Sequence, residues 1–115
     1  EVLAAQMRQA QPPFRSIVAD TGEGRLVGFA LFFTSYSTWR GQPGLYLEDL
    51  FVEATHRRRG IGRALFKALE TLGQRNGYKR LEWSVLDWNE LAIGFYRKLG
   101  ALPMKGWTTW RINLD

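Results

Sequence analysis

Residues 45–72 carry the sequence LYLEDLFVEATHRRRGIGRALFKALETL. The first part, 45–52, is a largely apolar run that predicts a strand, and the part from Ile61 onward has the spacing of an amphipathic helix. Between them lies a loop rich in arginine and glycine, Arg57-Arg58-Arg59-Gly60-Ile61-Gly62. A helix N-terminus carries unpaired N–H groups and partial positive charge, and glycines let the backbone approach an anion. We therefore expect a phosphate-binding loop here, with a solvated basic turn as the alternative.

The rest of the chain alternates strand and helix patterns around this stretch. Period-two alternation or short apolar runs predict strands over residues 14–19, 26–36, 45–52, 80–85 and 107–114. Apolar spacing and stop residues predict helices over residues 2–10, 61–74 and 89–99, ended by Pro12-Pro13, Gly77 and Gly100. An antiparallel meander followed by a strand–helix–strand–helix–strand unit predicts a mixed α/β sheet with a right-handed parallel crossover.

Length and composition narrow the classes of protein to consider. The chain has 115 residues, which suits a single domain over 1–115. It has no cysteine and one histidine, His56, so we expect no disulfide, no metal site and a cytoplasmic location. No apolar run is long enough to cross a membrane, so we expect no membrane partner. The net charge of +5 favours an anionic partner, either nucleic acid or a phosphorylated small molecule.

Two adjacent carboxylates, Glu48 and Asp49, interrupt the apolar strand predicted over 45–52. The structural explanation is that charges on an edge strand discourage aggregation. The functional explanation is a general base and a cation-binding carboxylate placed shortly before the phosphate loop. A bulge at this point would re-aim one of the two side chains.

Asn89 and Tyr96 lie seven residues apart, on one face of the helix predicted over 89–99. Asn89 can cap the start of this helix, which alone would explain it. Tyr96 is either a core tyrosine with a satisfied hydroxyl or a functional residue.

Four motifs in this order resemble the GNAT superfamily of N-acetyltransferases, and within it the diamine (spermidine/spermine) and thialysine acetyltransferase branch. They are YLEDLFV at 46–52, Arg57-x-x-Gly60-x-Gly62, LDWNE at 86–90 and FYRKLGA at 95–101; YSTW at 36–39 also matches that branch. The resemblance implies a central mixed sheet of GNAT type and a homodimer. Members of the family usually begin with a strand and a helix that this chain lacks, so we expect an N-terminally truncated domain.

The resemblance also implies that acetyl-CoA is the acetyl donor. The backbone of Leu50, Phe51 and Val52 would hold its pantetheine arm and direct N–H groups toward the thioester carbonyl. Asn89 and Tyr96 would contact the donor near its thiol end. The pyrophosphate would be wrapped by Arg57, Arg58, Arg59, Gly60, Ile61, Gly62 and Arg63.

The implied acceptor is a primary amine of a small molecule, such as a diamine, a polyamine or a thialysine-like amino acid. Tyr96 would be the general acid, Glu48 the base acting through water, and Asp49 a ligand of the cationic acceptor. The acceptor pocket would be lined by Glu82, Trp83 and Ser84. An alkylamine with a pKa of about 10.4 must lose a proton before it attacks, so a carboxylate base fits this chemistry. Direct attack in a ternary complex needs no nucleophilic cysteine or serine and no metal.

Two alternatives of other classes are an acetyl-CoA-binding module without turnover and a basic nucleic-acid-binding domain. The aromatic residues sit mostly in apolar strand patterns and are not interleaved with the basic residues. We therefore expect no nucleic-acid partner.

Overall fold

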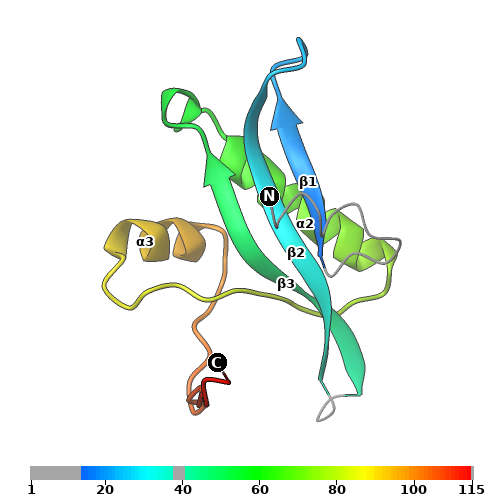
Figure 1. The fold of residues 1–115 in the computed structure, drawn as a ribbon, viewed down its shortest axis with the longest axis vertical. Coiled ribbons are helices and arrows are strands. Elements are labelled where there is room, and N and C mark those ends of the chain that lie inside the picture. Colours follow the sequence, from blue (N-terminus) through cyan, green and yellow to red (C-terminus); the bar gives the residue numbers. More distant parts are fainter. Residues whose placement is uncertain (1–13, 38–40, 115) are drawn as a thin grey trace. The chain divides into compact units, whose positions relative to one another are not determined.

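The strands of this chain form one four-stranded sheet in the order β1-β2-β3-β4, shown in a computed structural model that describes residues 14–37 and 41–114 (Figure 1). The elements in chain order are β1 (Arg15–Asp20), β2 (Leu26–Ser37), β3 (Gln42–Val52), the 3₁₀ helix η1 (Ala54–His56), α2 (Ile61–Arg75), β4 (Leu81–Glu82) and α3 (Glu90–Lys98). Strands β1, β2 and β3 pair antiparallel, whereas β3 and β4 pair parallel. This confirms the predicted mixed α/β sheet with its meander and its parallel strand–helix–strand unit.

The chain divides into two compact units, Glu1–Ser84 and Val85–Asp115. The first unit contains the whole sheet and α2, and the second contains α3. The helix predicted over residues 2–10 lies outside the described residues.

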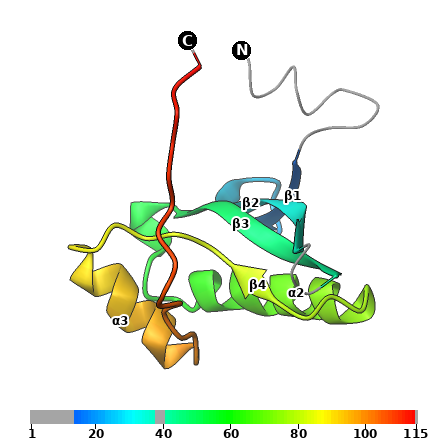
Figure 2. The ribbon, with the colours of Figure 1, turned by 90° about the horizontal axis from the view of Figure 1, so that it is seen from below.

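Helix α2 covers one face of the sheet formed by β1, β2 and β3 (Figure 2). Its apolar residues recur at the spacing of one helical face, so they point together toward the strands. The core between helix and sheet is aliphatic and aromatic, and removing it from water is the main stabilising contribution to this unit. The buried hydrophobic residues are Val27, Ala30, Phe32, Leu45, Leu47, Leu65, Phe66 and Leu69.

Gly28 lies where α2 begins to pack on the sheet. A Cβ atom at this position would lie 3.0 Å from the carbonyl oxygen of Phe51 and 3.3 Å from Cγ2 of Ile61. A glycine inside a strand often marks a bulge, and the register of β1 and β2 does shift here: Ala19 pairs with Gly28 and Asp20 with Leu26, so Val27 is an additional residue. The missing side chain therefore allows the start of α2 to approach β2 and β3 closely.

Two predicted strands differ from the structure. The strand expected over 107–114 is not formed, and its residues, including Trp110 and Ile112, are largely exposed. Alternating apolar residues form a strand only when a neighbour accepts their backbone hydrogen bonds, and no strand pairs with this segment in the described part of the chain. Strand β4 is shorter than the predicted 80–85 because its pairing with β3 covers only Leu81 and Glu82.

Candidate functional site

A bulge in β3 places both predicted carboxylates at the surface. Leu31 of β2 pairs with Asp49 and the next residue, Phe32, pairs with Leu47, so Glu48 is an additional residue without a partner in β2. Leu47 is buried before the bulge, whereas Glu48 and Asp49 are both exposed. The bulge anticipated from the sequence is thus present, and it leaves two neighbouring carboxylates accessible to a cationic ligand.

Beyond the bulge, β3 has an edge with no neighbouring strand among the described residues. Strands β3 and β4 pair only at Leu45 and Tyr46, while β3 continues to Val52. Apart from the unpaired Glu48, the remaining residues of β3 pair with β2 on one side only. We call the other side, from Leu50 to Val52, the open edge.

The direction of the backbone groups at the open edge follows from one hydrogen bond at the end of β3. The N–H of Glu53 donates to the carbonyl oxygen of Val27 at 2.8 Å, so the backbone N–H of Glu53 points toward β2. Backbone groups alternate in direction along a strand, and those of Val52 and Leu50 therefore face away from β2. An extended ligand can pair with the N–H and carbonyl groups of Leu50 and with the N–H of Val52, as an additional strand would, whereas the Val52 carbonyl oxygen already accepts a hydrogen bond from Arg57 Nε.

Phe51 lies between these two residues and directs its side chain to the face of the sheet opposite α2. Its ring stacks on that of Phe29 with centroids 5.5 Å apart. The Phe51 side chain is 44% exposed, so this aromatic pair borders the open edge with an apolar surface.

The arginine and glycine loop connects the open edge directly to the start of α2. Arg57 donates from Nε to the carbonyl oxygen of Val52 at 3.0 Å, which ties the loop to the end of β3. Arg58 has a left-handed backbone with φ 64°, and Gly60 has φ 78° at the N-cap of α2. Such left-handed residues turn successive N–H groups toward one concave side, which is a typical anion nest.

The N-terminus of α2 adds its own donors to this loop. Gly60 provides no side-chain cap, and the first turn contains no acidic residue that would neutralise the helix dipole. Arg58, Arg59 and Arg63 are all exposed around this terminus. Backbone N–H groups, a positive helix end and exposed guanidinium groups are the features that typically bind a phosphate anion in proteins.

Glu53 anchors this region in a way that the sequence motifs did not reveal. Its carboxylate forms an ion pair with Arg25 and accepts a hydrogen bond from Thr55 Oγ1 at 3.0 Å. These contacts attach the turn before the arginine loop to the β1–β2 hairpin. Glu53 and Arg25 are far apart in sequence, so no local pattern could have indicated their pairing.

The three residues predicted for the acceptor pocket have different surroundings. Glu82 accepts from Arg80 Nε at 2.8 Å, and the hydroxyl groups of Ser84 and Tyr46 form a hydrogen bond of 2.6 Å. Both side chains lie on the face of the sheet opposite α2. Trp83 lies on the other face and packs edge-on against Phe66 of α2, with centroids 4.9 Å apart.

The remaining two predicted residues belong to the second unit. Asn89 Oδ1 accepts from the N–H of Ala92 at 3.2 Å, so Asn89 is the N-cap of α3. Tyr96 lies in α3 with its ring centroid 5.8 Å from that of Phe95. Burial raises the pKa of Tyr96 above its ordinary value of 10.0, because the phenolate is disfavoured away from water. The hydroxyl therefore stays protonated at neutral pH.

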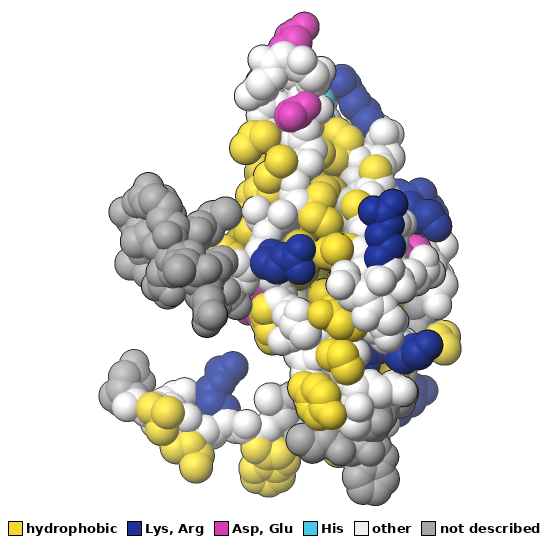
Figure 3. Space-filling view, turned by 90° about the vertical axis from the view of Figure 1, so that its right-hand side faces the viewer, with side chains coloured by type: hydrophobic (Ala, Val, Ile, Leu, Met, Phe, Trp, Pro, Cys, Tyr) yellow, Lys and Arg dark blue, Asp and Glu magenta, His cyan; other side chains and the backbone are white. Residues whose placement is uncertain are grey.

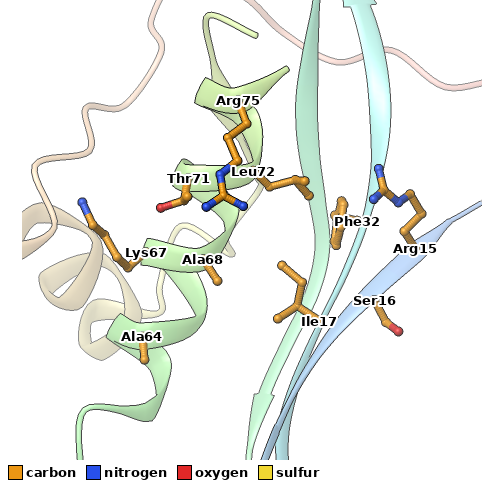
Figure 4. Close-up of a pocket in the computed structure, with 10 residues that line it drawn as sticks. All are labelled: Arg15, Ser16, Ile17, Phe32, Ala64, Lys67, Ala68, Thr71, Leu72 and Arg75. Atoms are coloured by element: carbon orange, nitrogen blue, oxygen red, sulfur yellow. The ribbon is translucent and has the colours of Figure 1, made fainter. Parts of the chain in front are cut away.

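A groove of about 530 Å³ lies between β1 and α2, and no residue of β3 lines it. Figure 3 shows hydrophobic side chains next to Lys and Arg side chains on this side, and Figure 4 shows how residues of β1 and α2 face one another across the groove. Ile17 and Phe32 contribute apolar surface, and Arg15, Lys67 and Arg75 contribute positive charge. None of the residues predicted for the donor or the acceptor lines it.

The first unit thus gathers most of the predicted site on one continuous segment. The two carboxylates, the open edge, the arginine loop and the start of α2 follow one another from Glu48 to Arg63.

In the described part of the chain, no helix is both long and apolar enough to cross a membrane.

Comparison with known proteins identifies the family. The model of the acetyltransferase (GNAT) family matches residues 2–101, and the chain belongs to this family. It is 39% identical over 90 residues to L-ornithine N5-acetyltransferase NATA1 of Arabidopsis thaliana, which covers 78% of this chain and 40% of that protein. It is 43% identical over 89 residues to thialysine N-epsilon-acetyltransferase of Caenorhabditis elegans, which covers 75% of this chain and 55% of that protein. The chain therefore spans about half the length of these two relatives.

Solved structures share the fold. An integron cassette protein from the mobile metagenome of V. cholerae superposes with a TM-score of 0.85 at 26% identity, covering 96% of this chain and 67% of that chain. An aminoglycoside acetyltransferase from a soil metagenomic sample superposes with a TM-score of 0.81 at 22% identity, covering 99% of this chain and 73% of that chain. These likenesses agree with the mixed sheet of GNAT type that the sequence motifs predicted.

Proposed function

We propose that this chain transfers the acetyl group of acetyl-CoA to a primary amine of a small molecule by direct attack in a ternary complex. The observation that carries the proposal is the continuity of the open edge with the arginine loop. An extended arm bound along Leu50 and Val52 leads to an anion site at the start of α2. Acetyl-CoA has this composition, since a pantetheine arm joins its thioester to a pyrophosphate.

The backbone and the loop have separate tasks in donor binding. Leu50, Phe51 and Val52 hold the pantetheine arm, and an N–H at this edge stabilises negative charge on the carbonyl oxygen during attack. The residues from Arg57 to Arg63 hold the pyrophosphate through N–H groups and guanidinium groups. Asn89 and Tyr96 complete the thiol end of the donor site in this proposal.

Proton transfers are assigned to Glu48 and Tyr96. Glu48 takes the proton of the ammonium through water, because its position in the bulge leaves the carboxylate exposed to solvent. The neutral amine forms a bond to the carbonyl carbon, and the carbon–sulfur bond then breaks. Tyr96 donates its proton to the departing thiolate, and its raised pKa keeps it in the required neutral form beforehand. The second proton, which the nitrogen loses as the amide forms, passes through water and restores the Tyr96 hydroxyl.

The acceptor class follows from charge and from the relatives. Asp49, exposed beside Glu48, attracts a cationic acceptor. Relatives of this chain are named for acetylation of ornithine and thialysine, which are amino acids with a second amino group. We therefore place small diamino compounds first among the acceptors.

A thiol-release assay with acetyl-CoA and a panel of amines tests this function. We expect release of the thiol that depends on the amine, and mass spectrometry should find the acetylated amine. Binding of acetyl-CoA without thiol release would contradict turnover and identify a binding module. Salt-sensitive binding of an oligonucleotide that acetyl-CoA does not displace would instead support nucleic-acid binding.

A further inference from the structure

Arg80 joins β4 to the far end of the β2–β3 hairpin. Its Nη1 donates to the carbonyl oxygen of Gln42 at 3.0 Å and its Nη2 to Ser35 Oγ at 3.3 Å. Its own carbonyl oxygen accepts from the N–H of Leu45 at 3.1 Å. The Arg80 side chain is only 16% exposed, so these contacts are made in a largely desolvated position.

Gly44 shows how closely the hairpin packs on this arginine. A Cβ atom at Gly44 would lie 2.6 Å from Cγ of Arg80, a distance that real structures do not allow. Ser35 Oγ also contacts the carbonyl oxygen of Gly44 at 3.4 Å. The position of the guanidinium group is therefore fixed from both strands of the hairpin.

The third group held by Arg80 is the carboxylate of Glu82. Arg80 Nε and Glu82 Oε1 are 2.8 Å apart, and the Glu82 side chain remains 42% exposed. Glu82 pairs in register with Tyr46, three residues before Asp49 on β3. Strand geometry puts Glu82 about 10 Å from Asp49 on the same face of the sheet, which is comparable with the length of an extended diamine.

We propose that Arg80 is a positioning residue that sets the selectivity of the acceptor site by neutralising Glu82. This inference rests on the proposed function and refines its acceptor. Glu82 is accessible to an acceptor, but its charge is already compensated by a guanidinium group that cannot lose its proton. Glu48 and Asp49 are then the carboxylates that attract ammonium groups. The distal ammonium of a diamine meets a neutral ion pair at Glu82.

The consequence is a measurable preference. The quantity to follow is the ratio of kcat/KM for hexamethylenediamine to kcat/KM for hexylamine, since these acceptors differ only by the second ammonium. Arg80→Met releases the Glu82 carboxylate, so the ratio is expected to rise about threefold to fivefold, the size of one surface ion pair. The double variant Arg80→Met/Glu82→Gln should return the ratio to the wild-type value. Arg75→Met, which removes an exposed arginine of α2, is the matched control and should leave the ratio unchanged.

Two single variants test the inference even if Arg80→Met does not fold. Glu82→Gln should lower the ratio by a similar factor, because it leaves the Arg80 guanidinium uncompensated where the distal ammonium would lie. Asp49→Asn should raise KM for both amines with a smaller effect on kcat.

Three results would overturn the inference. They are an unchanged ratio in folded Arg80→Met, a rise that survives in the double variant, and a rise of the ratio in Glu82→Gln. If the wild-type chain releases thiol with hexylamine, such results refute the role of Arg80 while the acetyltransferase function stands. If the wild-type chain releases no thiol with any amine, both proposals fail.

Discussion

Two replacements of Arg58 in the arginine loop distinguish the effect of its strained backbone from the effect of its positive charge. Arg58 is the one non-glycine residue with a positive φ in the described part of the chain. A left-handed backbone costs a residue with a Cβ atom about 1–2 kcal/mol. Arg58→Ala keeps this cost and loses the charge, whereas Arg58→Gly loses both. Glycine also gains unfolded-state entropy, which costs about 0.4–1 kcal/mol.

The difference between the two variants is therefore the informative quantity. Subtracting the entropy cost from the relieved strain leaves Arg58→Gly more stable than Arg58→Ala by about 0.5–1 kcal/mol. For a chain of this length the melting temperatures should differ by about 2–6 °C. Both variants should bind acetyl-CoA about fivefold more weakly than wild type, because each lacks one exposed cation at the phosphates.

Thermal unfolding followed by circular dichroism, together with calorimetric titration of acetyl-CoA, measures both quantities. A glycine variant that is less stable than the alanine variant would refute the left-handed conformation of Arg58. Unchanged affinity in both variants would remove Arg58 from the pyrophosphate site while leaving the strain argument intact.

Two further predictions concern the start of α2 and the general acid. Gly28→Ala should lower the free energy of unfolding by about 1 kcal/mol in chemical denaturation and weaken acetyl-CoA binding. The reason is that the new Cβ atom pushes on Ile61 and on the Phe51 carbonyl oxygen. The comparison variant is Gly77→Ala, where a Cβ atom meets no close neighbour and only the positive φ causes strain. Tyr96→Phe should lower kcat far more than acetyl-CoA affinity, and an unchanged rate would exclude Tyr96 as the acid. Because burial raises the pKa of Tyr96 above 10.0, the wild-type rate should rise from pH 7 to 9 as the amine loses its proton, and a fall there would contradict this assignment.

Local patterns were sufficient to predict most of the sheet and the helix that covers it. The period-two runs, the turn glycines and the helical spacing from Ile61 each depend on neighbours in the sequence, so they predicted β1, β2, β3 and α2. The cap at Asn89 is equally local, and the structure confirms it. The segment 107–114 has the same alternation but forms no strand, because a strand also requires a partner edge.

Contacts between distant residues could not be predicted in this way. Arg80 meets Gln42 and Ser35 only after β4 has returned alongside β3 through the α2 crossover. Its sequence neighbourhood only placed it in the alternating strand predicted over 80–85. Long-range pairing of a charged side chain leaves no periodic signal, so its burial becomes visible only in the structure.

The bulge at Glu48 relates the hydrophobic pattern of β3 to the proposed chemistry. Leu45 and Leu47 have the phase of one face, and Leu50 and Val52 continue on that face only because one additional residue lies between the pairs. Without the bulge, Asp49 and Phe51 would turn toward α2 and the core would contain a carboxylate, which is costly. The same insertion turns the backbone groups of Leu50 and Val52 toward the open edge. The fold therefore requires the irregularity for its core, and the exposed carboxylates and the open edge follow from that requirement.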